Sequence, residues 1–162
     1  MVKPKPAGRN DGHVVGYTLI IDHVYVGSNL CEGAICPIHG PEFKKLGVCV
    51  EINLDDDRKE IPPDDIESYT WMPVVDGYPP SEVQLYSATA IMHEAISRKR
   101  TVYVHCQNGH GRSPTLVAAY LIRYKDMTPA EANELIMQRR PEIHIEDRQM
   151  RALENFSSEL NE

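Results

Sequence analysis

One segment in this chain constrains the fold more than any other. Residues 101–105 (Thr-Val-Tyr-Val-His) are β-branched and aromatic, which is typical of a strand. They lead directly into a loop, 106–113, which contains Gly109 and Gly111, and an apolar segment, 114–122, follows at once. Glycines permit the tight backbone path that such a loop needs. A strand, a short loop and a helix in direct succession predict an α/β fold.

Other strand-like and helix-like segments alternate along the chain. Further strands are expected within 14–21, 24–26, 47–54 and 69–74. Capping boxes that begin at Ser81 and Thr128 predict two helix starts, and a last helix is expected over about 146–160. The helix after Ser81 is expected to bury a stripe made of Val83, Tyr86, Ala90, Ile91 and Ala95. Together these elements predict an α/β domain in which helices flank a central sheet.

Length and composition are those of one globular domain. The chain has 162 residues, of which 41% are hydrophobic and 25% charged. Residues 1–12 are polar and rich in Lys, Pro and Gly, so we expect a flexible tail there and a single domain over 13–162. The net charge of −7 argues against a general binder of nucleic acid or of anionic membranes, because both need a basic surface.

The cysteine content and the N-terminus indicate a compartment. Four cysteines are too few for a disulfide framework, so a reducing environment is expected. The first eight residues are polar and interrupted by proline, which does not fit a signal peptide. No apolar run approaches the roughly 20 residues of a membrane span. The sequence therefore predicts a cytoplasmic protein.

The loop that follows the strand carries the chemistry. Its backbone N–H groups can converge on one anion, and the helix N-terminus adds the positive end of its dipole. Cys106 opens the loop, where these donors would lower the pKa of its thiol. Arg112 offers a planar fork that suits a phosphate. A nucleophile aimed at a bound dianion predicts phosphoryl transfer through a cysteinyl-phosphate.

The residues His105-Cys106-x5-Arg112-Ser113 form the signature of the cysteine-dependent protein tyrosine phosphatase superfamily. The chain resembles its compact, dual-specificity branch over nearly all of residues 14–157. The segments 21–28 and 43–54 are similar to elements of these domains, as is the Arg-Pro that ends at residue 141. The resemblance implies a mixed, mainly parallel sheet of about five strands flanked by helices. It also implies a phosphatase that acts on phosphotyrosine proteins, with phosphoserine and phosphothreonine proteins as a wider range.

The family mechanism needs a general acid, because an alkoxide or phenoxide leaves poorly unless it is protonated. Members of the family carry an aspartate on a loop between a strand and the helix that precedes the catalytic strand. The corresponding segment here is Val-Val-Asp-Gly-Tyr-Pro-Pro at 74–80, so we expect Asp76 in this role, ahead of Asp64 or Asp65.

The resemblance assigns the remaining roles residue by residue. Cys106 would attack phosphorus as a thiolate, and Ser113 would donate a hydrogen bond to its sulfur. His105 would support the loop by hydrogen bonding. The phosphate would be held by the loop residues Gln107, Asn108, Gly109, His110, Gly111 and Arg112. No metal and no cofactor are required.

Two weaker signals accompany this pattern. Cys31, Cys36 and His39 have spacing that suggests a metal site, but structural zinc normally takes four ligands, so loop or core positions are favoured. His110 would add positive charge to the loop when protonated, whereas Gln107 is neutral, which does not support a strongly basic phosphoinositide pocket. The role of His110 stays open, as does a disulfide between Cys106 and another thiol.

Three functions remain in competition. The leading hypothesis is a phosphatase of phosphorylated proteins. The second keeps the chemistry but changes the substrate to a phosphoinositide, an RNA 5′-phosphate or a small metabolite. The third is a catalytically inactive module that binds phosphorylated partners, although the cysteine, arginine and acid are all present. The oligomeric state is not encoded in any pattern that we recognise.

Overall fold

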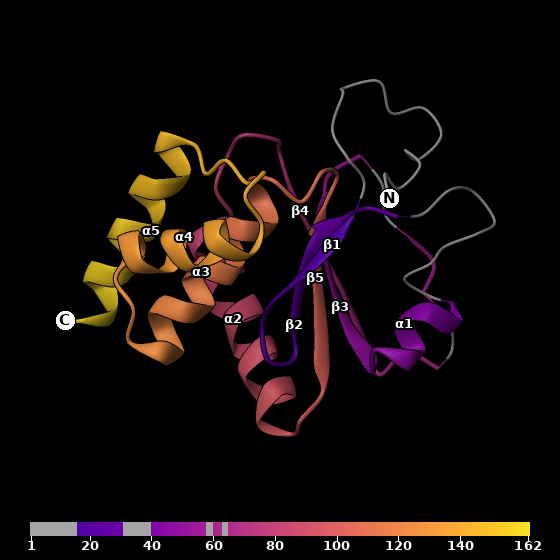
Figure 1. The fold of residues 1–162 in the computed structure, drawn as a ribbon. Coiled ribbons are helices and arrows are strands. Elements are labelled where there is room, and N and C mark those ends of the chain that lie inside the picture. Colours follow the sequence, from indigo (N-terminus) through magenta and orange to yellow (C-terminus); the bar gives the residue numbers. More distant parts are fainter. Residues whose placement is uncertain (1–15, 31–39, 58–59, 63–64) are drawn as a thin grey trace.

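A five-stranded sheet forms the centre of the molecule (Figure 1). The computed structural model describes residues 16–30, 40–57, 60–62 and 65–162. Its strands lie in the order β1-β2-β5-β3-β4, and only β1 and β2 pair antiparallel. The strands are β1 (Tyr17–Ile21), β2 (Val24–Ser28), β3 (Val48–Asp55), β4 (Ser68–Val74) and β5 (Thr101–Cys106). The predicted α/β fold with a mixed, mainly parallel sheet is therefore confirmed.

Helices cover both faces of this sheet. The helices are α1 (Pro41–Lys45), α2 (Glu82–Ser97), α3 (Arg112–Lys125), α4 (Pro129–Arg139) and α5 (Asp147–Leu160). Figure 1 shows α2, α3, α4 and α5 on one face and the short helix α1 on the other. The centre of the four is α3, which packs against α2, α4 and α5 and is buried from Arg112 to Ile122. None of the described helices combines the length and hydropathy of a membrane span.

Both predicted capping boxes are present, at Ser81 and Thr128, but the predicted apolar stripe of α2 is partly wrong. Val83 is 74% exposed, and Ala90 also faces solvent. The face that packs inward is formed by Leu85, Ala88, Thr89, Met92 and Ala95. Because Thr89 is polar, it obscures this buried face in the sequence. Its burial costs little because its hydroxyl donates to the Leu85 carbonyl at 2.7 Å.

The parallel arrangement brings the carboxyl ends of β2, β5, β3 and β4 to the same end of the sheet. Cys106 ends β5, Asp55 ends β3 and Val74 ends β4, and the chain continues into a loop after each. In an α/β sheet the crevice outside the carboxyl ends of the strands is the usual place for a ligand site. The predicted tail over 1–12, the start of the first strand, Cys31, Cys36, His39 and Asp64 lie outside the described residues.

Candidate active site

The Cys106 side chain lies at the bottom of the loop between β5 and α3, and the residue is only 2% exposed. Its Sγ is 3.3 Å from the Ser113 hydroxyl and accepts from the Gly109 backbone N–H, also at 3.3 Å. Burial would raise the pKa of this thiol, but the Arg112 charge and these hydrogen bonds outweigh it and lower the pKa below its ordinary value. The site therefore favours a thiolate.

The backbone of the loop is oriented from outside. The carbonyl of every residue from 107 to 111 accepts a hydrogen bond from a group outside the loop's concave side. The Asn29 N–H donates to the carbonyl of residue 107, and the His144 N–H donates to that of residue 110. Arg140 donates to the carbonyls of residues 108 and 109, and Ser28 Oγ also donates to that of 108. Thr115 donates to the carbonyl of residue 111. Because a trans peptide places its C=O and N–H on opposite sides, the N–H groups of 108–112 turn toward the loop's interior. This is the geometry of an anion cradle.

Gly109 is needed at the point where the loop crosses β2. Its φ is +72°, a left-handed value that disfavours side chains, and a Cβ there would lie 2.5 Å from the backbone of Gly27. Arg140, which is 2% exposed, connects the loop to β1 at this point. Its Nε donates to the Gly109 carbonyl at 2.9 Å, and its Nη1 donates to Thr18 Oγ1 at 3.0 Å. The loop is thus built into the core of the molecule.

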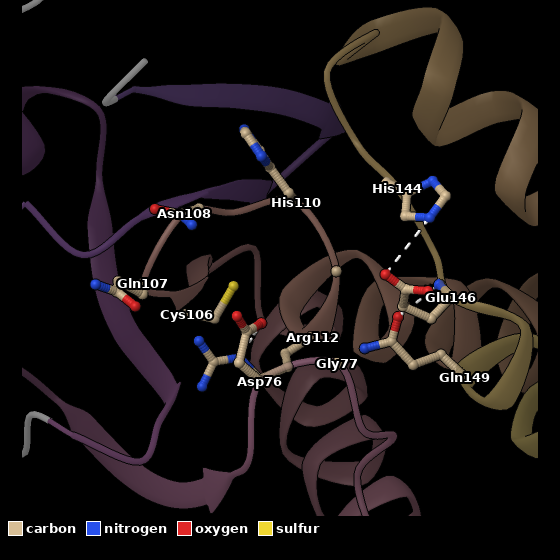
Figure 2. A pocket seen from close by; sticks show the side chains of 11 residues that line it. Asp76, Gly77, Cys106, Gln107, Asn108, His110, Arg112, His144, Glu146 and Gln149 are labelled. Atoms are coloured by element: carbon tan, nitrogen blue, oxygen red, sulfur yellow. Dashed lines mark hydrogen bonds and ion pairs between the residues drawn. The ribbon is translucent and has the colours of Figure 1, made fainter. Parts of the chain in front are cut away.

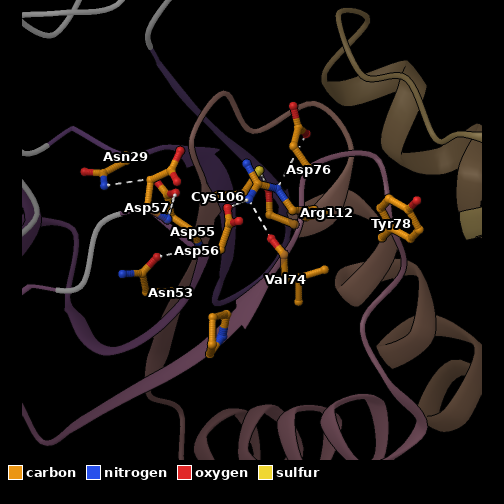
Figure 3. A network of polar contacts seen from close by, with 12 residues as sticks. Asn29, Asn53, Asp55, Asp56, Asp57, Val74, Asp76, Tyr78, Cys106 and Arg112 are labelled. Carbon is orange, nitrogen blue, oxygen red and sulfur yellow. Dashed lines mark hydrogen bonds and ion pairs between the residues drawn. The ribbon is translucent and has the colours of Figure 1, made fainter.

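Arg112 begins α3 and joins the three loops at the sheet edge (Figure 3). Its Nη1 donates to Asp56 Oδ1 at 2.9 Å and to the Val74 carbonyl at 2.7 Å. Its Nε lies 3.6 Å from Asp76 Oδ1. The guanidinium is nearly fully buried, and these acceptors fix its plane next to the cysteine.

Asp76 lies on the loop 75–80, between β4 and α2, and its side chain is 76% exposed. A turn closed by Tyr78 N–H on the Val75 carbonyl, with Gly77 at a φ of +81°, brings the carboxylate over the cysteine. The two face the same cavity of about 410 Å³ (Figure 2). The cavity is lined by Asp76, Gly77, Cys106, Gln107, Asn108, His110, Gly111, Arg112, His144, Glu146 and Gln149. Asp65, the alternative acid, instead pairs with Lys44 on α1.

A buried polar cluster lies behind the loop. The predicted support of the loop by the His105 ring is corrected here, because its Nε2 bonds to Glu51 Oε1 on β3 at 2.7 Å, and not to the loop. Burial would lower the pKa of His105, but this hydrogen bond and the negative charges of Glu51 and its other neighbours together outweigh burial and raise the pKa. Burial also raises the pKa of the neighbouring Glu60 carboxyl. Both shifts favour the protonated forms of His105 and Glu60.

Two groups among the described residues could offer atoms to a cation. One is the buried cluster of Glu51, Glu60 and His105, and the other is Asp55, Asp56 and Asp57. In the second group Asp56 is bonded to Arg112, and Asp55 accepts from Asn29 Nδ2 and from the Asp57 N–H. These oxygens already serve the loops around Arg112, and in the first group Glu51 Oε1 is already bonded to His105 Nε2, so neither group is assigned to a metal.

The comparison with protein families decides the identity of this domain. Residues 34–159 match the family described as the dual specificity phosphatase catalytic domain. The chain belongs to this family. The predicted resemblance to the dual-specificity branch of the tyrosine phosphatase superfamily is thereby confirmed.

Named relatives of this dual specificity phosphatase domain come from several organisms. Phosphatidylglycerophosphate phosphatases PTPMT1 and PTPMT2 of Arabidopsis thaliana are 32% and 35% identical over 126 and 123 residues, which are 74% and 72% of this chain. The chain spans 37% and 54% of the lengths of these two proteins. Mouse laforin is 34% identical over 57% of this chain and 29% of its own.

Solved structures share the fold of this phosphatase domain. The crystal structure of PTPMT1 in complex with PI(5)P has a TM-score of 0.79 at 24% identity, covering 90% of this chain and 96% of that one. Human DUSP28 has a TM-score of 0.78 at 19% identity, covering 98% and 100%. At these identities the likeness shows the common fold.

The structure also contains site residues that the sequence did not single out for the phosphatase loop. In the sequence Arg140 is only part of a family-like Arg-Pro, yet in the structure it donates to two carbonyls of the loop. Asp56, in an acidic turn, orients Arg112, and Gln149, on α5, lines the cavity. Glu51 is a fully buried carboxylate in the middle of β3. Its signal in the sequence is a charged residue inside the apolar segment Val-Cys-Val-Glu-Ile at 48–52, where a charge is rarely buried without a partner.

Proposed function

We propose that this domain hydrolyses phosphate monoesters through a cysteinyl-phosphate intermediate. The observation that carries the proposal is the loop itself, in which the carbonyls of residues 107–111 all bond outward around a thiol whose pKa is lowered. Oriented N–H groups stabilise the charge of a transferring phosphoryl group without reorganising during the reaction. An uncharged ligand would gain nothing from such an arrangement.

In the first step the Cys106 thiolate attacks phosphorus, an S–P bond forms and the ester P–O bond breaks. The loop N–H groups and Arg112 hold the equatorial oxygens, where charge accumulates in the transition state. Asp76 gives its proton to the leaving oxygen. Its position over the cavity, beside Arg112, supports this assignment.

In the second step Asp76 takes a proton from water, and the water attacks phosphorus. The S–P bond breaks, inorganic phosphate leaves and the thiolate is restored. Ser113 Oγ, at 3.3 Å from Sγ, is placed to stabilise the departing thiolate. A reducing compartment such as the cytoplasm, which the sequence predicts, would keep this thiol reduced.

The substrate class is a separate part of the proposal. The sequence predicts a phosphorylated protein as the substrate, and this stays a prediction. The similarity to phosphatidylglycerophosphate phosphatases supports the alternative substrate class, a phosphate monoester on a lipid or small-molecule headgroup. We therefore propose the lipid phosphomonoester as the first substrate to test.

The test is phosphate release from a panel that contains phosphatidylglycerophosphate in mixed micelles, a phosphotyrosine peptide and a phosphoserine peptide. Cys106→Ser is the control, and it should release no phosphate from any substrate. We expect the highest kcat/KM on the lipid. A higher value on the peptides would restore the phosphoprotein hypothesis, and release by Cys106→Ser at the wild-type rate would overturn the mechanism.

A further inference from the structure

The loop 75–80, which carries Asp76 and is called the acid loop below, has few contacts of its own. Its one internal turn is closed by the Tyr78 N–H on the Val75 carbonyl, at 3.0 Å. The side chains of Val75 and Tyr78 are exposed to 58% and 51%. Although Pro80 at its end is buried, packing into the core does not determine where Asp76 lies. Besides Arg112, whose Nε is 3.6 Å from Asp76 Oδ1, contacts from other elements must do so.

The first such contact comes from Gln149 in the first turn of α5. Gln149 is fully buried, and its Nε2 donates to the Tyr78 carbonyl at 3.1 Å. Its Oε1 accepts from the Glu146 N–H at 2.8 Å, as part of the capping box that begins α5. Because one end of the amide meets an N–H and the other a C=O, its orientation is fixed. The same side chain thus starts a helix and holds the acid loop.

The second contact comes from the preceding residue of α5. The Arg148 guanidinium lies 4.1 Å from the centre of the Tyr78 ring, a cation–π distance. Consecutive residues of one helix therefore hold both the backbone and the ring of Tyr78, two positions beyond Asp76. Figure 2 shows Gln149 beside Glu146 and His144, across the cavity from Cys106.

We propose that Gln149 and Arg148 are positioning residues that hold the acid loop, and with it the Asp76 carboxyl, over the cysteine. The inference rests on the proposed phosphatase function. A general acid works only within hydrogen-bond reach of the leaving oxygen, so a loop released from α5 loses acid catalysis while the nucleophile stays intact. The defect is therefore confined to substrates whose leaving group needs a proton.

The experiment compares kcat for an aryl phosphate with a good leaving group and for an alkyl phosphate with a poor one. Gln149→Ala should lower kcat about tenfold on the alkyl ester, which is the loss expected from one buried hydrogen bond, and leave the aryl ester within about twofold. Arg148→Ala should show the same pattern at a few-fold size. Arg151→Ala removes an exposed cation from the same helix and should change neither rate.

Hydrogen exchange of the backbone N–H groups of residues 75–78 provides a readout that does not depend on activity, since residues 79 and 80 are prolines and have no N–H. Exchange should accelerate in Gln149→Ala and Arg148→Ala but not in Arg151→Ala. Equal losses on both esters, or unchanged exchange in all three variants, would overturn the inference. An inactive wild-type protein would instead overturn the proposed function, and the exchange data would still decide whether α5 holds the loop.

Discussion

The phosphate loop, 106–112, and the acid loop, 75–80, face the same cavity but are built in opposite ways. The carbonyls of 107–111 in the phosphate loop are held from outside, and Cys106 and Arg112 are each 2% exposed. The acid loop has an internal turn, an aspartate that is 76% exposed, and a hydrogen bond and a cation–π contact from α5 that both reach Tyr78. The first loop is part of the core, and the second rests on the surface.

Because of this difference, substitutions in the two loops should have different effects on stability and on the reaction rate. Changes in the outer contacts of the phosphate loop should lower the free energy of unfolding and weaken phosphate binding together, because the same hydrogen bonds serve both. Changes in the acid loop should alter the rate with little effect on stability, since exposed loops contribute little to the free energy of folding. The variants below test this separation, from the largest expected effect to the smallest.

Asp76→Asn should have the largest effect on rate. The amide keeps the shape of the side chain but cannot supply the proton, so kcat on an alkyl phosphate should fall about 10²- to 10⁴-fold. The loss should be much smaller on an aryl phosphate with a good leaving group, and the urea midpoint should not move. Asp57→Asn, an exposed aspartate in the acidic turn after β3, serves as the control. Equal losses on both esters would remove Asp76 from the acid role.

Arg140→Met should affect the other side of the comparison. It removes charged hydrogen bonds to the carbonyls of 108 and 109, so the free energy of unfolding should drop by about 3 kcal/mol, and inhibition by inorganic phosphate should weaken. Arg139→Met removes the exposed neighbour and should stay within about 0.5 kcal/mol. Urea unfolding measures both. A stable Arg140→Met variant with normal phosphate inhibition would contradict the structural role of this arginine.

Ser113→Ala should have the smallest effect, and it concerns pH. Ser113 stabilises the thiolate and so contributes to the lowered pKa of Cys106, and its loss should raise that pKa. Thiolate is then populated only at higher pH, so the acidic limb of inactivation by iodoacetate should move to higher pH. An unchanged midpoint would show that the Ser113 hydroxyl does not act on the sulfur.

The two loops also differ in how far the sequence predicts them. The phosphate loop is local: Cys106, the glycines and Arg112 lie within seven consecutive positions between a strand and a helix, so periodicity and residue chemistry suffice. The acid loop required a family resemblance, since an Asp-Gly pair is a common turn in any protein. Its aspartate becomes meaningful only when the end of β4 is brought beside the end of β5.

What the sequence could not predict are the contacts between distant elements. Arg140 reaches the phosphate loop and β1 from the end of α4, and Gln149 reaches the acid loop from α5. Both are polar residues that read as surface positions until packing buries them. The same holds for Thr89, whose burial displaced the predicted stripe of α2, and for His105, whose ring turned to Glu51.

The central claim is that phosphate passes through Cys106, and trapping the intermediate tests it most directly. In Ser113→Ala the thiolate leaves the phosphoenzyme less readily, so the intermediate should accumulate during a single turnover. Rapid denaturation followed by mass spectrometry should then find a phosphoryl group on the peptide that contains Cys106, and none in Cys106→Ser. Substrate consumed with the phosphoryl group on another residue, or on no residue at all, would contradict the account.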